Sequence, residues 1–126
     1  MKKRENPKAY LTIDMKKRRI RIYKQTLRLL GDPEYIYFLV NERKRVLGIR
    51  ASESKDPPAQ KIYWEVLEEN GQCCEFYSTY FIEKLKTKVI GFEEQRTMKA
   101  IGKWNSKMQA IVFDLSSMTP VGDETI

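Results

Sequence analysis

The chain of 126 residues contains no histidine, only two cysteines and no long apolar run. Histidine is the commonest general base and a frequent metal ligand, so its absence excludes Ser-His-Asp and Cys-His catalysis and most zinc sites. No stretch approaches the roughly 18 apolar residues of a membrane-spanning helix, and the basic start lacks the apolar segment of a secretion signal. We therefore expect a cytoplasmic protein that does not enter a membrane.

Motifs that carry chemistry are also scarce. The six glycines are scattered, and Gly31 follows an expected helix where a phosphate-binding loop would precede one. The neighbouring carboxylates Glu68 and Glu69, like Glu93 and Glu94, diverge in turns and form no catalytic pair. Asp114 interrupts an apolar strand, where it either pairs with a Lys or Arg or ends the strand on an exposed face. The sequence predicts no enzyme activity, no cofactor and no metal.

The two cysteines are adjacent, at Cys73 and Cys74. Neighbouring residues of a strand point to opposite faces, so they cannot clamp one metal ion. We expect Cys73 and Cys74 to lie on opposite faces of a strand, one in the core, in a reducing compartment.

Alternating apolar and polar residues, turn residues and glycines divide the chain into two similar parts. Residues 1–8 are expected to be a mobile basic arm, 51–60 a linker with two prolines, and 116–126 a flexible tail. The elements expected in the first part, residues 9–50, are strands at 9–13 and 18–23, a helix at 24–30 capped by Gly31, and strands at 35–40 and 46–50. Those expected in the second part, residues 61–115, are strands at 61–67 and 73–77 joined at Asn70-Gly71, a helix at 79–90, and strands at 96–104 and 108–115.

Both parts therefore have the expected order β-β-α-β-β. Four strands and one short helix bury too little apolar surface alone, whereas two copies together build one core. We predict an α+β, mostly β fold in which the two halves pack as one barrel-like, pseudo-symmetric domain. Trp64 and Trp104 are expected to be buried between the halves.

The two parts differ in charge. Residues 1–50 contain 15 Lys and Arg against 5 Asp and Glu, whereas residues 51–126 contain 9 against 12. Within the first part, residues 15–28 hold seven bases and no acid. Such a concentration of positive charge attracts polyanions, but it does not indicate which polyanion the protein binds. It is typical of a nucleic-acid surface, but a solvated basic face, a contact with the chain's own acidic half, an anionic membrane or an acidic protein partner remain alternatives.

Residues 11–50 resemble a known family. Leu11-Thr12-Ile13-Asp14, residues 17–22, Leu27-Arg28-Leu29-Leu30-Gly31 and the hairpin at 35–50 are similar to the swapped-hairpin DNA-binding proteins of the AbrB, SpoVT and MraZ type. Asp14 and Arg18 match the family's D-x-x-x-R element. The resemblance implies interlocked units, a bacterial transcription regulator, and DNA contacts from Lys16, Lys17, Arg18, Arg19, Arg21, Lys24 and Arg28.

The sequence departs from that family in its first turn, where Lys17-Arg18 replaces Gly-Arg, and at the helix start, where Tyr23-Lys24 replaces proline. The second half has no D-x-x-x-R element. The chain also resembles small uncharacterised bacterial proteins, a likeness that implies no mechanism.

These observations lead to one functional hypothesis and its rivals. The basic first half is expected to bind nucleic acid, duplex DNA above all, in a regulatory or accessory role. The candidate contact residues are Lys16, Lys17, Arg18, Arg19, Arg21, Lys24, Arg28, Arg43, Lys44 and Arg45. The alternative is a protein-interaction module, meeting an acidic partner or a second copy of the chain. A small-ligand domain would need a deep pocket, which the sequence neither shows nor excludes.

Overall fold

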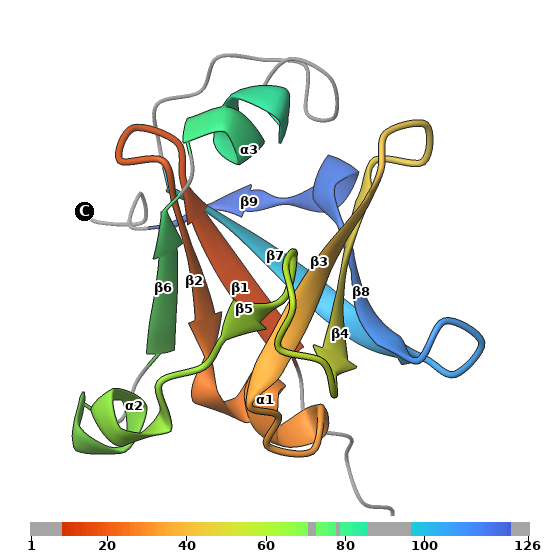
Figure 1. The fold of residues 1–126 in the computed structure, drawn as a ribbon. Helices are drawn as coiled ribbons and strands as arrows, with labels where there is room; N and C mark the ends of the chain where they lie inside the picture. Colours follow the sequence, from red (N-terminus) through yellow and green to blue (C-terminus); the bar gives the residue numbers. More distant parts are fainter. Residues whose placement is uncertain (1–8, 71–72, 78, 86–96, 122–126) are drawn as a thin grey trace, which may run out of the picture.

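The computed structural model describes residues 9–70, 73–77, 79–85 and 97–121, and in these ranges the chain is mostly β-structure. Figure 1 shows a sheet that curls into a half-barrel, with short helices at its ends. The elements are β1 (Ala9–Asp14), β2 (Arg19–Tyr23), α1 (Lys24–Leu29), β3 (Tyr35–Asn41), β4 (Val46–Ser52), β5 (Gln60–Lys61), α2 (Trp64–Asn70), β6 (Cys73–Tyr77), α3 (Thr79–Lys84), β7 (Thr97–Asn105), β8 (Ala110–Asp114), the 3-10 helix η2 (Leu115–Ser117) and β9 (Thr119–Pro120).

The strands lie in the order β5-β3-β4-β8-β7-β1-β2-β6, and every neighbouring pair is antiparallel. β9 adds to the side of β7. Strands β5 and β6 are the two ends of this order, so the barrel is open between them (Figure 1). The mostly β, barrel-like α+β fold expected from the sequence is confirmed.

The core fills the inside of the curl. Alternate residues of each strand point inward, such as Leu11 and Ile13 of β1 and Ile20 and Ile22 of β2, and all four are essentially inaccessible to solvent. Gly102 of β7 is required by this packing, because a Cβ there would lie 2.5 Å from Cε2 of the buried Phe113. The strand alternation of the sequence therefore translates directly into an inner apolar face and an outer face.

Three hairpin turns, 15–18, 42–45 and 106–109, share one construction. The last residue of the first strand, Asp14, Asn41 or Asn105, accepts a hydrogen bond from the backbone N–H three residues later, at 2.9 to 3.0 Å. Each turn then ends with a residue at positive φ: Arg18 (54°), Arg45 (57°) and Gln109 (55°). Asp and Asn side chains stabilise turns in this way, and positive φ is unusual for residues other than glycine. The Asp14-x-x-x-Arg18 spacing thus has a local structural role that recurs in two other hairpins.

The first half folds as predicted, with β1-β2-α1-β3-β4 in the expected order and bounds within two residues for most elements. Gly31 follows α1 at a φ of 90°, the conformation expected of a helix-capping glycine. The linker folds back at Ala59, whose N–H donates to the Asp56 carbonyl at 3.0 Å, and leads into β5.

The second half departs from the predicted order. The strand expected at 61–67 is wrong: β5 spans two residues and α2 follows it. Within α2, the half-buried Trp64 and the buried Leu67 are three residues apart while Val66 is exposed, which is a helical spacing and not an alternating one. Strand β6 therefore pairs with β2, far upstream, and not with a hairpin partner across Asn70-Gly71. Trp104, expected in the core, is exposed, and Trp64 is half-buried with its indole N–H donating to the Pro33 carbonyl at 2.7 Å.

The helices lie at opposite ends of the half-barrel. Helices α1 and α2 are at one end and α3 is at the other, between the turns 15–18 and 42–45 (Figure 1). Part of the segment expected to be a flexible tail is ordered, because Thr119–Pro120 pairs with β7. Three predicted segments lie outside the described residues: the arm 1–8, the last part of the helix expected at 79–90, from residue 86 on, and residues 122–126 of the expected tail. In the described part of the chain, no helix has the length and apolar character needed to cross a membrane.

Candidate nucleic-acid interface

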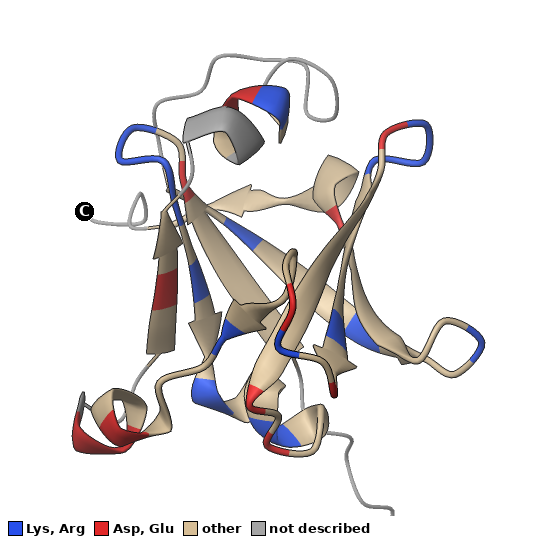
Figure 2. Ribbon diagram, viewed as in Figure 1, with Lys and Arg blue, Asp and Glu red and all other residues tan. Residues whose placement is uncertain are grey.

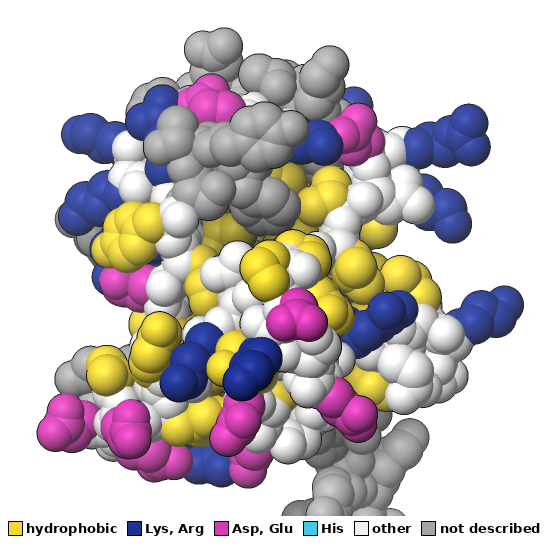
Figure 3. Space-filling view, in the orientation of Figure 1, with side chains coloured by type: hydrophobic (Ala, Val, Ile, Leu, Met, Phe, Trp, Pro, Cys, Tyr) yellow, Lys and Arg dark blue, Asp and Glu magenta, His cyan; other side chains and the backbone are white. Residues whose placement is uncertain are grey.

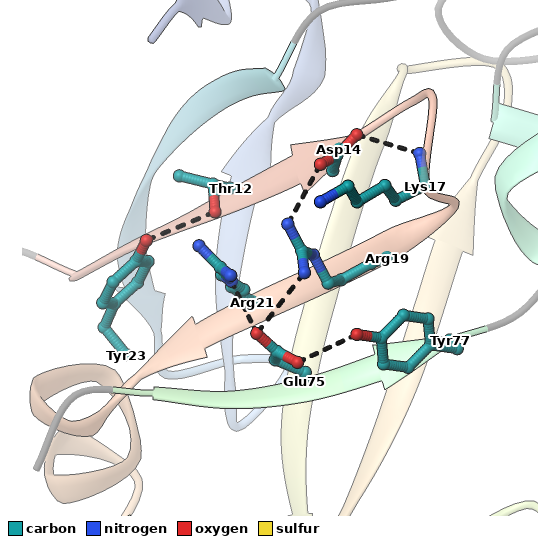
Figure 4. Close-up of polar contacts among 8 residues, drawn as sticks. All are labelled: Thr12, Asp14, Lys17, Arg19, Arg21, Tyr23, Glu75 and Tyr77. Carbon is teal, nitrogen blue, oxygen red and sulfur yellow. Dashed lines mark hydrogen bonds and ion pairs between the residues drawn. The ribbon is translucent and has the colours of Figure 1, made fainter. Parts of the chain in front are cut away.

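The outer face of β1, β2 and β6 carries a ladder of charged side chains (Figure 4). The register places Thr12, Arg21 and Glu75 in one cross-strand row and Asp14, Arg19 and Tyr77 in the next. Arg21 Nε donates to Glu75 Oε2 at 2.8 Å, and Arg19 Nη1 lies 3.7 Å from the same oxygen. Arg19 Nη2 also donates to Asp14 Oδ2 at 3.0 Å. Two predicted DNA-contacting arginines are thus engaged by carboxylates of the chain itself.

Glu75 is the centre of this ladder. Its other oxygen accepts a hydrogen bond from the Tyr77 hydroxyl at 3.0 Å. Partial desolvation raises the pKa of the Glu75 carboxyl, but the hydrogen bonds from Arg21 and Tyr77 outweigh it and leave that pKa below its ordinary value. The hydrogen bond to Glu75 in turn raises the pKa of Arg21. Glu75 and Arg21 therefore stay ionised at neutral pH, and their ion pair fastens β6 to β2.

Two further bases of the predicted set lie at the α1–α2 end of the barrel. Lys24 Nζ is 3.2 Å from Glu68 Oε1, and Arg28 contacts both Asp32 at 3.1 Å and Glu68 at 3.6 Å. Glu34, Glu65 and Glu69 lie at the same end, where carboxylates outnumber Lys and Arg among the described residues, and we call it the acidic end. A polyanion would be repelled there, so Lys24 and Arg28 do not join the rest of the predicted surface.

The opposite end, around the turns 15–18 and 42–45, is basic (Figure 2). Among the described residues it carries Lys16, Lys17, Arg18, Arg43, Lys44, Arg45 and Lys84 against Asp14, Glu42, Glu83 and Asp114, and we call it the basic end. Arg18 pairs with Glu83 at 2.6 Å and Lys84 pairs with Glu42 at 3.2 Å. These two pairs connect α3 to both hairpin turns. Among the described residues no carboxylate pairs with Lys16, Lys17, Arg43, Lys44 or Arg45.

The ten predicted residues are therefore divided among three places. Five of them, Lys16, Lys17, Arg43, Lys44 and Arg45, lie at the basic end as solvent-exposed charges, in two turns on either side of α3. Arg18 is there too, in a half-exposed ion pair, and Arg19 and Arg21 belong to the outer ladder. For Arg18, Arg21, Lys24 and Arg28, the alternative of a contact with the chain's own acidic half is what the structure shows.

Several residues of these sites were not predicted. Glu68, Glu75 and Glu83 are the carboxylates that pair with the basic first half, and Lys84 adds a base to the basic end. Asp114 ends β8 at an exposed position, which is one of the two expected alternatives, and no described base pairs with it. Its side chain also accepts hydrogen bonds from the N–H and hydroxyl of Ser116 and so caps the start of η2. Those hydrogen bonds from Ser116 lower the pKa of Asp114.

The aromatic side chains near the basic residues are engaged in packing. Tyr10 and Tyr23 stack at 4.6 Å on the outer face, and the Lys99 ammonium lies 4.3 Å from the centre of the Tyr10 ring. Cys73 and Cys74 are free thiols on opposite faces of β6, as expected. Within the described ranges, no cluster of three or more Cys, Asp or Glu side chains is arranged to hold a metal ion.

Comparison of the chain with models of protein families, with curated proteins and with solved structures finds no match.

Proposed function

We propose that the protein binds nucleic acid, and duplex DNA in particular, through the basic end, in a regulatory or accessory role. The observation that carries this proposal is that two basic turns project from the same end of the barrel. Lys16 and Lys17 of one turn and Arg43, Lys44 and Arg45 of the other lie exposed at the same end of the barrel, and the described carboxylates leave them unpaired. Exposed Lys and Arg neutralise phosphates and release condensed counterions, which favours binding to a polyanion.

The ion pairs at the basic end add to this surface. The Arg18–Glu83 and Lys84–Glu42 pairs are about 40% exposed on each side. Pairs of such exposure contribute only about 0–1 kcal/mol, so a phosphate can replace the carboxylate at little cost. Arg19 and Arg21 are different, because the ladder holds them against the outer sheet face, and they contribute to the fold instead.

Duplex DNA fits the basic end better than a single strand does. Single-stranded nucleic acid is commonly held by aromatic side chains that stack on its bases. The turns 15–18 and 42–45 contain no aromatic residue. A duplex presents two rows of phosphates along each groove, and we propose that each basic turn contacts one row. Contacts to phosphate fix the position of the protein on the duplex and do not read its sequence.

The test is fluorescence anisotropy of a labelled DNA duplex at several salt concentrations. The test variant is Arg43→Gln/Lys44→Gln/Arg45→Gln; glutamine suits position 45 because Gln109 occupies the equivalent position at positive φ. The matched control, Lys55→Gln/Lys103→Gln/Lys107→Gln, removes the same three charges from exposed positions outside the basic end.

We expect the test variant to bind the duplex more weakly and to reduce the slope of log K against log salt by about 2.7, roughly 0.9 for each phosphate that is no longer neutralised. The control should change both quantities much less. Equal weakening by the two variants would mean that net charge alone attracts DNA, and absence of wild-type binding at low salt would refute the proposal.

A further inference from the structure

A groove runs along the open side of the half-barrel, between β6 and the segment that contains β5 and α2. Its volume is about 680 Å³, and its lining includes Lys61, Tyr63, Val66, Cys73, Glu75 and Tyr77. It continues into a smaller cavity of about 250 Å³ lined by Ile20, Phe38, Phe76 and Ile82. Gln60, Phe76 and Tyr77 line both, so the two hollows form one continuous groove with an apolar floor. Figure 3 looks onto this side and shows apolar side chains around the hollowed surface.

Strand β6 presents an open edge to this groove. It is the last strand in the order of the sheet, and among the described residues its neighbour is β2 alone. An edge strand offers unpaired N–H and C=O groups that are a template for another strand. On the other side of the groove, β5 is only two residues long. The sheet is therefore interrupted where one more strand would continue it.

The apolar surface of the protein gathers at the same place. The three most exposed large hydrophobic side chains in the described ranges are Tyr77 (63%), Tyr63 (59%) and Val66 (53%). All three line the groove. They come from β6, the segment after β5, and α2, so the fold and not the sequence brings them together. Exposed apolar side chains that cluster beside a groove are typical of a binding site for another chain.

We propose that an extended segment of a partner protein binds in this groove as an additional strand on β6. Its backbone pairs with the β6 edge, and its side chains alternate between the two faces of the extended sheet. Inward-facing positions carry apolar side chains of moderate size, because the space beside Phe38, Phe76 and Ile82 is apolar and small. Outward-facing positions lie beside Tyr63, Val66 and Tyr77.

Charge specifies one end of the partner segment. Helix α2 packs against β6 and carries the exposed carboxylates Glu65 and Glu69. Lys24 and Arg28 engage Glu68, and no described base pairs with Glu65 or Glu69. A Lys or Arg of the partner is therefore favoured at the end of the segment that lies next to α2.

A second copy of this chain is the less suitable occupant. Two β6 strands paired over their whole length about a two-fold axis would run antiparallel and place Glu75, the central residue, opposite its own copy. Like charges directly opposite each other in a sheet are destabilising. A partner with a neutral or basic residue opposite Glu75 avoids that repulsion, and this surface is separate from the basic end.

The experiment uses a displayed library of nine-residue peptides in which apolar residues alternate with random polar residues. Selected peptides are labelled with fluorescein and titrated with the wild-type protein, with Tyr63→Ser/Val66→Ser and with a matched control, Ile101→Ser/Trp104→Ser. The control residues are each 52% exposed but do not line the groove. Melting curves verify that both variants fold.

We expect binding by the Tyr63→Ser/Val66→Ser variant to be at least about tenfold weaker, since truncation of central apolar contacts dominates such interfaces. The control should bind as the wild type does, and the selected peptides should be enriched in Lys or Arg at one end. Methylation of alternate backbone nitrogens in one peptide register should abolish binding, whereas methylation in the other register should not.

Three results would overturn the proposal. The first is a selection that yields no peptide whose binding depends on Tyr63 and Val66. The second is binding that is equally sensitive to both sets of backbone methylation. The third is a wild-type dimer in sedimentation that the Tyr63→Ser/Val66→Ser variant dissociates, because a second copy would then occupy the groove. The basic-end variant should bind these peptides normally, so this test and the DNA test fail independently.

Discussion

The ion-pair ladder predicts that Glu75 holds the edge strand β6 on the sheet. Glu75 accepts hydrogen bonds from Arg21 and Tyr77 and lies 3.7 Å from Arg19, whose side chain is only 13% exposed. Exposed ion pairs contribute about 0–1 kcal/mol each, and a partly buried arginine that loses a partner adds a desolvation penalty. After allowance for the partial exposure of Glu75, we expect Glu75→Gln to lower the free energy of unfolding by about 1–2 kcal/mol.

Urea unfolding measures this loss. With an m-value typical of a small domain, the midpoint for Glu75→Gln should fall by roughly 0.5–1 M. Glu53→Gln is the control, because Glu53 is an exposed carboxylate to which no described base is paired. A double-mutant cycle of Arg21→Gln and Glu75→Gln isolates the pair, and its coupling should be about 0.5–1 kcal/mol. Coupling indistinguishable from zero would refute the view that the ladder fastens β6.

The pH dependence of the free energy of unfolding is a second test of the stabilisation by Glu75. Because the pKa of folded Glu75 lies below its ordinary value of 4.5, the stabilisation is complete above that value and is lost as pH falls through the lowered pKa. The stability difference between the wild type and Glu75→Gln should therefore be constant between about pH 7 and pH 5.5, and should shrink in more acidic solution. A difference that grows as the pH falls would contradict the assignment.

Two further predictions concern the core and the thiols. Gly102→Ala should destabilise the protein by about 1–3 kcal/mol because its Cβ would overlap the buried Phe113 ring. The control Gly48→Ala, whose Cβ would meet Leu39 at an ordinary 3.6 Å, should change stability by less than about 1 kcal/mol; equal losses would refute the packing argument. Burial raises the pKa of Cys74 to about 12, so a thiol reagent at pH 8 should spare it in the folded protein and titrate both cysteines in denaturant. Rapid modification of both thiols in the folded state would contradict that burial.

Local patterns in the sequence were sufficient for the first half of the fold. The alternation in 9–13 and 18–23 and the glycine at position 31 gave β1, β2 and α1, because these elements are joined by short turns and pair with their neighbours. The same logic was wrong at 61–67. There Ile62, Trp64 and Val66 alternate, but Trp64 and Leu67 are three residues apart, which is a helical spacing. A short apolar run fits both periods, and only the tertiary packing against β6 decides between them.

The candidate site was predictable in composition and not in arrangement. The excess of Lys and Arg in the first half is visible directly, whereas the partners of these residues are distant in sequence. Glu68, Glu75 and Glu83 lie 44, 54 and 65 positions from Lys24, Arg21 and Arg18 respectively. Such pairs depend on β6 lying beside β2, which no local pattern specifies. The groove was not predicted for the same reason, since its lining comes from separate segments of the chain.

Folding converts a charge difference between two halves of the sequence into one between two ends of the barrel. The acidic second half neutralises the bases that lie on the β2 face and beside α1, and these pairs attach β6 and α2 to the first half. Among the described residues, five bases of the turns 15–18 and 42–45 have no carboxylate partner, because these short hairpins extend beyond the reach of the acids in α2 and β6; they are Lys16, Lys17, Arg43, Lys44 and Arg45. The net charge of residues 1–50 therefore overstates the surface available to a polyanion. A substitution at Arg19 or Arg21 changes the stability of the fold, so a loss of binding in such a variant cannot be assigned to a lost DNA contact. Substitution of the exposed turn bases Lys16, Lys17, Arg43, Lys44 and Arg45 separates the two effects, because the side chains of these residues take no part in the ladder or in the core.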